Sequence, residues 1–195
     1  MHELYILRED QMHLEVSGNK YRKLKYNFLE AQSLNSKGLL SFGGAYSNHI
    51  AALAALGKQN EIPTVGIIRG EELFSKIKEN PTLSFAVACG MQLDFISRQA
   101  YKKKEETSFI NTIKEKFENY YIIPEGAALT WQLKAAKKFF QIIHIILIIS
   151  ACQLEQEDYN GIVKASLPHQ TVLGFSALKG TFQEEIIKKY TQNKF

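Results

Sequence analysis

LLSFGGAYSNHIAALAALG, the sequence of residues 39–57, joins an apolar run to an alanine-rich run through two glycines. Residues 39–42 predict a buried strand, and residues 50–57 predict a helix that begins after Ser47 and Asn48, both good helix caps. Gly43 and Gly44 permit the tight turn between the two elements, and Gly57 is expected to end the helix. The stretch therefore predicts a strand, a short polar loop and a helix.

The polar loop at residues 43–49 is a candidate binding site. At a helix N-terminus, backbone N–H groups and the helix dipole favour an anion such as a carboxylate or a phosphate. The alternative is that Ser47 and Asn48 only cap the helix. The loop lacks the G-x-G-x-x-G spacing of dinucleotide-binding folds, so the pattern alone leaves both interpretations open.

On either side of this stretch, β-rich runs alternate with helix-compatible segments. The runs occupy residues 38–42, 64–68, 93–96 and 120–123, and the helical segments lie at 50–58, 83–89 and 107–118. This alternation predicts βαβ units, and hence an α/β fold with parallel sheets and flanking helices. Ligands in such folds bind at the carboxyl ends of the strands, which is where the 43–49 loop is expected.

The composition is that of an ordinary globular protein. Of the 195 residues, 45% are hydrophobic, and the 24 Lys and Arg residues exceed the 20 Asp and Glu residues by four. The positive residues are scattered except for Lys102–Lys104, a run that fits a solvated helix face better than a nucleic-acid contact. The chain is therefore not expected to bind nucleic acid.

Neither a membrane span nor a metal site is expected. The apolar stretch 142–149 is shorter than the ~20 residues that a membrane helix needs, and it predicts a buried strand or an aggregation-prone segment. Cys89 and Cys152 lie too far apart for a metal motif, and no export leader precedes Leu4. The expected compartment is the cytoplasm.

Further motifs extend from the N-terminus to residue 126. The chain reads RED at 8–10 and SGNKYRKLK at 17–25, then FGGAYSNH at 42–49, IPTVGIIRG at 62–70, CGM at 89–91 and IPEG at 123–126. In this order and spacing, the motifs resemble the pyridoxal-phosphate-dependent family of 1-aminocyclopropane-1-carboxylate deaminases and D-cysteine desulfhydrases. The resemblance covers about the first two-thirds of the chain. It implies a tryptophan-synthase-β-like fold, which is fold type II among the enzymes that use this cofactor.

The resemblance assigns roles to five residues. Lys20, which follows the Gly-Asn pair, would hold pyridoxal 5'-phosphate covalently, since a lysine amine condenses with an aldehyde. Asn19 and Asn48 would also bind the cofactor, and Ser47, Asn48 and His49 would bind the substrate. Ser47 also matches the position of a catalytic serine. No metal is implied.

The resemblance breaks after residue 126. The family continues there with a second glycine, a helix, a strand and a Thr-Gly-Thr-Gly-Gly loop that binds the cofactor phosphate, whereas this chain has no glycine between Gly126 and Gly161. If residues 153–158 are encoded as CAA CTG GAA CAG GAG GAT, the same nucleotides read two positions later encode Thr-Gly-Thr-Gly-Gly. We therefore expect a frameshift within residues 127–158, and a chain that is truncated relative to the family.

The resemblance also implies a domain division and a reaction. Residues 37–119 would form a small α/β domain, and residues 1–36 with 120–195 would form an incomplete large cofactor domain. A small amino acid, 1-aminocyclopropane-1-carboxylate or D-cysteine, would be converted to a 2-keto acid and ammonia. Two alternatives stay open: a catalytically inactive relative that survives as a globular or interaction module, and a nucleotide- or phosphate-binding protein that uses the 43–49 loop alone. A small amino acid is the expected partner, and a homodimer is left open.

Overall fold

The computed structural model describes residues 19–125, 147–150 and 171–174. The chain divides into two compact units, residues 1–127 and 128–195. In the second unit, the described residues form two parallel strands, β5 (Leu147–Ser150) and β6 (Thr171–Gly174). The first unit contains the residues predicted to form the site.

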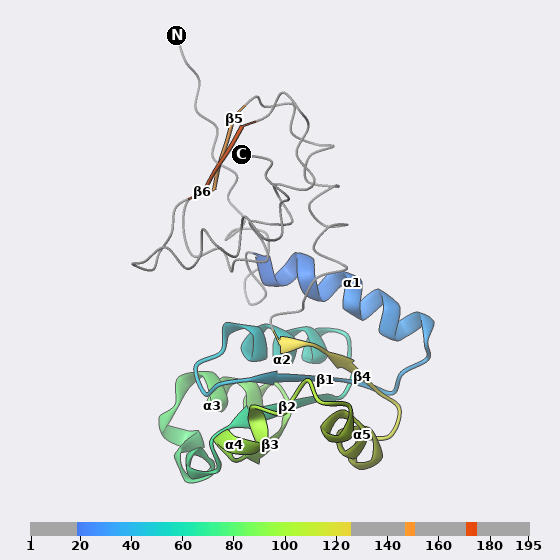
Figure 1. Cartoon of the computed structure of the whole chain (residues 1–195), viewed down its shortest axis with the longest axis vertical. Helices are drawn as coiled ribbons and strands as arrows, with labels where there is room; N and C mark the ends of the chain where they lie inside the picture. Colours follow the sequence, from blue (N-terminus) through green and yellow to red (C-terminus); the bar gives the residue numbers. More distant parts are fainter. Residues whose placement is uncertain (1–18, 126–146, 151–170, 175–195) are drawn as a thin grey trace. The chain divides into compact units, whose positions relative to one another are not determined.

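The first unit is built on a four-stranded parallel sheet (Figure 1). Its strands are β1 (Gly38–Gly43), β2 (Thr64–Arg69), β3 (Gln92–Ile96) and β4 (Tyr120–Ile123), in the order β3-β2-β1-β4. The four predicted strands and the parallel α/β class are confirmed. The chain moves outward from β1 to β3 and then returns to the other side of β1 for β4, so the direction of winding reverses between β1 and β4. Such a switch point is the usual ligand site of an open parallel sheet.

Helices cover both faces of this sheet. Helices α1 (Asn19–Ser33), α2 (Asn48–Gln59) and α3 (Pro81–Ala88) contribute to one apolar cluster, and α4 (Arg98–Tyr101) and α5 (Thr107–Lys116) contribute to the other. Successive strand side chains point to opposite faces. In β1, Leu39 accordingly packs in the first cluster, whereas Leu40 and Phe42 pack in the second.

Helix α2 continues past Gly57, so the prediction that this glycine ends the helix is wrong. A Cβ at residue 57 would meet the side chain of Thr64 and lie 2.9 Å from the carbonyl oxygen of Ile62. Glycine therefore allows the helix to approach the start of β2. The chain turns two residues after the helix ends, at Glu61, whose φ is 53°.

Strand β4 lies at the edge of the sheet, next to β1. Its residues pair with β1, in a register that places Ser41 opposite Ile123. Residues 120–123, which the sequence assigned to the large domain, form the edge strand of the sheet that contains β1. The wider division into residues 37–119 and residues 1–36 with 120–195 stays a prediction.

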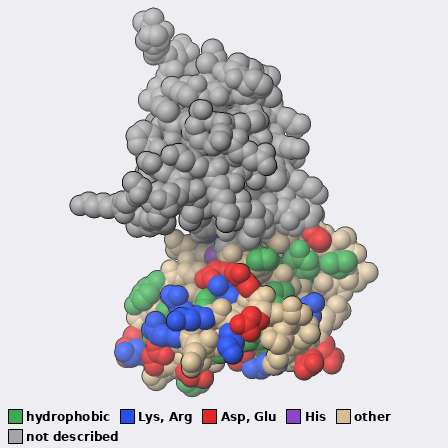
Figure 2. Space-filling view, in the orientation of Figure 1, with side chains coloured by type: hydrophobic (Ala, Val, Ile, Leu, Met, Phe, Trp, Pro, Cys, Tyr) green, Lys and Arg blue, Asp and Glu red, His purple; other side chains and the backbone are tan. Residues whose placement is uncertain are grey.

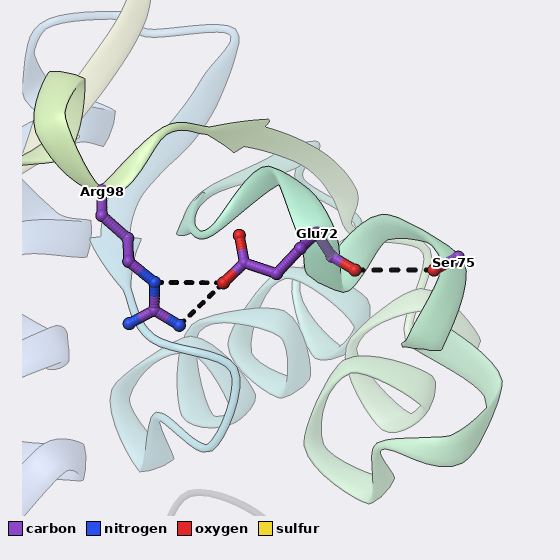
Figure 3. Close-up of polar contacts among 3 residues, drawn as sticks. All are labelled: Glu72, Ser75 and Arg98. Carbon is purple, nitrogen blue, oxygen red and sulfur yellow. Dashed lines mark hydrogen bonds and ion pairs between the residues drawn. The ribbon is translucent and has the colours of Figure 1, made fainter.

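An exposed ion pair connects the 3-10 helix η2 (Glu71–Glu79) to α4 (Figure 3). Arg98 donates two hydrogen bonds to Glu72 Oε1, at 3.0 Å from Nε and 2.7 Å from Nη2. These bonds lower the pKa of Glu72. Their contribution is therefore present above the ordinary carboxyl pKa and is lost as the pH falls through the lowered value. Because both side chains are exposed, the pair contributes little to stability.

Acidic and basic side chains are interspersed on the visible face of the first unit (Figure 2). None of the helices that the structure describes is long and apolar enough to cross a bilayer.

Candidate active site

The loop after β1 forms a tight turn that leads directly into α2. The Ser47 amide donates to the carbonyl of Gly44 at 3.1 Å. Ser47 has φ −75° and ψ 113°, and its Oγ accepts a hydrogen bond from the amide of Ile50 at 3.3 Å. Ser47 is thus the N-cap of α2. The prediction that this helix begins at the carboxyl end of β1 is confirmed.

Replacing Gly43 by Ala should destabilise the chain by about 1–3 kcal/mol. A Cβ at residue 43 would meet the side chain of Ile50 and lie 2.9 Å from Ser47 Oγ, so the cap and the first turn of α2 would have to move. Gly44 provides the matched control, because a Cβ there would have one neighbour, Arg69 Nη2, at 3.6 Å. Chemical denaturation of G43A and G44A measures the difference. Equal stability of the two variants would contradict this close packing.

Three of the predicted site residues meet at the start of α2. Asn48 is its first residue and is exposed, whereas Ser47 is half-buried. His49 is 3% exposed, and its Nε2 lies 2.8 Å from the hydroxyl of Ser41 in β1. The His49 imidazole thus contacts the sheet through Nε2.

Lys20 lies in the first turn of α1. Its side chain is 9% exposed, which is unusual for a lysine. Helix α1 packs against α2 and β1, the two elements that the candidate loop joins. Asn19 is the first residue of this helix, and its side chain lies outside the described residues. The expectation that Lys20 and Ser47 share a pocket stays a prediction.

A second polar cluster lies at the carboxyl ends of β2 and β4, and the sequence did not predict it. The Tyr101 ring is buried, with Arg69 Cζ 5.6 Å and Lys104 Nζ 5.4 Å from its centroid. Lys104 Nζ also lies 3.3 Å from Glu125 Oε2. Burial, and then the Glu125 carboxylate, raise the pKa of the Tyr101 hydroxyl, which therefore stays protonated at neutral pH. Arg69 and Glu125 lie in the quoted motifs IPTVGIIRG and IPEG, the only hint of this cluster in the sequence.

A comparison with profiles of known protein families finds no match. A Thermotoga maritima protein provisionally named 1-aminocyclopropane-1-carboxylate deaminase is 28% identical over 177 residues, covering 89% of this chain and 53% of the relative. The mitochondrial protein of Arabidopsis thaliana named bifunctional D-cysteine desulfhydrase/1-aminocyclopropane-1-carboxylate deaminase is 31% identical over 134 residues, covering 65% of this chain and 33% of the relative. The crystal structure of an ACC deaminase homologue matches with a TM-score of 0.64 at 18% identity, covering 95% of this chain and 59% of that chain.

The chain is a fold type II homologue of these deaminases and desulfhydrases. The resemblance found in the sequence, and the fold that it implied, are confirmed. This fold type II homologue spans about half the length, or less, of the two curated relatives described above.

Enzymes of fold type II use pyridoxal phosphate. The described residues of this homologue fit the aldehyde of that cofactor and the carboxylate of an amino-acid substrate. Lys20 offers a primary amine on a buried side chain, as covalent attachment to an aldehyde requires. The capped N-terminus of α2 offers backbone N–H groups and the Ser47 hydroxyl to a carboxylate. The expected phosphate loop falls within residues 127–158, which, apart from β5, lie outside the described residues. The frameshift therefore stays a prediction.

Proposed function

We propose that the chain is by descent a pyridoxal-phosphate-dependent enzyme that converts a small amino acid to a 2-keto acid and ammonia. The proposed substrates are 1-aminocyclopropane-1-carboxylate and D-cysteine, the latter also releasing sulfide. The observation that carries the proposal is the position of the capped α2 N-terminus, at the switch point between β1 and β4 and in the same unit as the buried Lys20. The names of the relatives support the same chemistry.

In this proposal Lys20 holds the cofactor through its side-chain amine. The bound cofactor supplies an electron sink for carbanion chemistry at the substrate. The same Lys20 amine would also be a base able to move a proton at the substrate α-carbon. A lysine serves both roles because a primary amine is a nucleophile and a base.

Ser47 and Asn48 orient the substrate at the start of α2. Ser47 Oγ uses a lone pair to accept from the Ile50 amide, so its O–H proton can be donated to a substrate carboxylate or to a reacting atom. Asn48 is exposed at the first position of the helix, and its amide can bind the substrate or the cofactor ring. The dipole of α2 favours a negative charge at this point.

A catalytically inactive relative is the second candidate, and a specific observation favours it. The chain has no glycine between Gly126 and Gly161, where the family has its phosphate-binding loop. Without backbone amides in such a loop, a phosphate loses its main hydrogen-bond donors. The intact sheet and helices of the first unit would then survive as a globular or interaction module. A cytoplasmic location is a further part of the proposal, and a homodimer stays open.

Titration of the chain with pyridoxal phosphate up to millimolar concentration separates the two candidates. The enzyme should develop a saturable visible absorbance band that changes when D-cysteine is added, with release of sulfide and ammonia. An inactive relative should develop no band at any concentration, and that result would overturn the proposed function. A protein that binds phosphate through the 43–49 loop alone would instead bind inorganic phosphate equally well after replacement of Lys20.

A further inference from the structure

A buried chain of hydrogen bonds runs from the start of α2 through β1 to β4. His49 Nε2 lies 2.8 Å from Ser41 Oγ, and Ser41 Oγ lies 2.8 Å from the carbonyl oxygen of Ile123. Ser41 is fully buried, and His49 is nearly so. Buried polar groups must be paired to avoid a large desolvation cost, so the geometry of these hydrogen bonds is tightly constrained.

The carbonyl at its end fixes the direction of every proton. A backbone carbonyl can only accept, so the single hydroxyl proton of Ser41 goes to Ile123. Ser41 Oγ must then accept from His49, which requires a proton on Nε2. A neutral imidazole carries one proton. The geometry therefore places a proton on Nε2, and a neutral His49 is the Nε2–H tautomer.

These hydrogen bonds lie at the switch point of the sheet. Ser41 and Ile123 are register partners in the adjacent strands β1 and β4. His49 is the second residue of α2 and directly follows Ser47 and Asn48. The hydrogen bonds therefore connect the start of the helix to both strands between which the winding reverses.

We propose that Ser41 is a positioning residue, which holds His49 as the Nε2–H tautomer and thereby fixes Ser47 and Asn48 at the carboxyl edge of the sheet. The inference rests on the proposed function, in which those two residues orient the substrate. Ser41 itself touches neither substrate nor cofactor. His49 is a positioning residue too, because its buried imidazole contacts Ser41 through Nε2. The sequence had predicted that His49 binds the substrate.

Nuclear magnetic resonance of the full chain without cofactor tests this assignment. Long-range proton–nitrogen spectra should show His49 protonated on Nε2 and unprotonated on Nδ1 at neutral pH. In S41A, hydrogen exchange at the Ile50 and Ala51 amides should accelerate by about 10-fold or more relative to amides in the middle of α2. S41T keeps a hydroxyl and should retain most of the protection.

Two substitutions of His49 provide a matched pair. The side-chain amide of glutamine in H49Q reaches about as far as Nε2 and can donate to Ser41, whereas the shorter amide of asparagine in H49N cannot. We expect H49Q to keep the slow exchange at the start of α2 and H49N to lose it. A general loss of stability would accelerate exchange along the whole helix instead.

An Nδ1–H tautomer of His49 would overturn the proposal, and so would equal acceleration along all of α2 in S41A. None of these measurements uses pyridoxal phosphate. Failure of cofactor binding with the predicted tautomer and exchange pattern would therefore contradict the proposed function, while the link from Ser41 to the start of α2 would stand.

Discussion

Encoding residues 129–158 in the frame two nucleotides later should raise the affinity for pyridoxal phosphate by about a thousandfold or more. With the codons given for residues 153–158 in the sequence analysis, the shifted frame encodes the Thr-Gly-Thr-Gly-Gly loop, whose backbone amides can surround a phosphate. Each hydrogen bond to a charged group contributes about 1.5–3 kcal/mol, and three such bonds exceed the roughly 4 kcal/mol that corresponds to a thousandfold. Absorbance titrations of the two proteins measure the difference.

Negative charge in residues 155–158 of the unshifted chain should weaken cofactor binding further. Glu155, Glu157 and Asp158 lie where the family has its phosphate loop. The triple variant E155Q/E157Q/D158N of the unshifted chain removes this charge without adding the loop. We expect it to recover only a small part of the affinity. Tight binding by the unshifted chain itself would contradict the predicted frameshift.

Consider the protein in which residues 129–158 are encoded in the frame two nucleotides later. Replacing Lys20 by Ala in that protein should abolish the visible band that appears on binding of pyridoxal phosphate. The band requires a bond between the cofactor aldehyde and a lysine amine, and no other residue type can supply it. K20R is a stringent second variant, because the guanidinium keeps the positive charge but does not condense with the aldehyde under these conditions.

K23A is the matched control for this experiment. Lys23 is also in α1, three residues after Lys20, and the same substitution there should leave the band intact. A band that survives in K20A and disappears in K23A would move the attachment site and refute the assignment.

The strands and α2 were predictable because the signals for them are local. Each strand is a short apolar run bounded by turn-forming residues, and α2 follows a loop whose capping serine is evident in the sequence. The position of Gly57 inside the helix was not predictable. Glycine is common at helix ends, but here it is needed for close packing against Thr64. That contact involves a side chain from the next strand.

The hydrogen bonds of Ser41 were beyond any local pattern. A serine within the apolar run 39–42 looks like an ordinary strand residue, and its acceptor, the carbonyl of Ile123, lies 82 residues later. The cluster around Tyr101 could not be predicted from a local pattern either, because Arg69, Lys104 and Glu125 come from three separate segments. The sequence did predict that the 43–49 loop lies at the carboxyl end of a strand, but not which buried residues hold that loop in place.

The identity of the modified lysine tests the central claim most directly. Borohydride treatment of the chain at saturating pyridoxal phosphate makes the attachment permanent, and peptide mapping then locates it. We predict that the label lies on Lys20, whose buried side chain is in the first turn of α1. Label on another lysine would contradict the account.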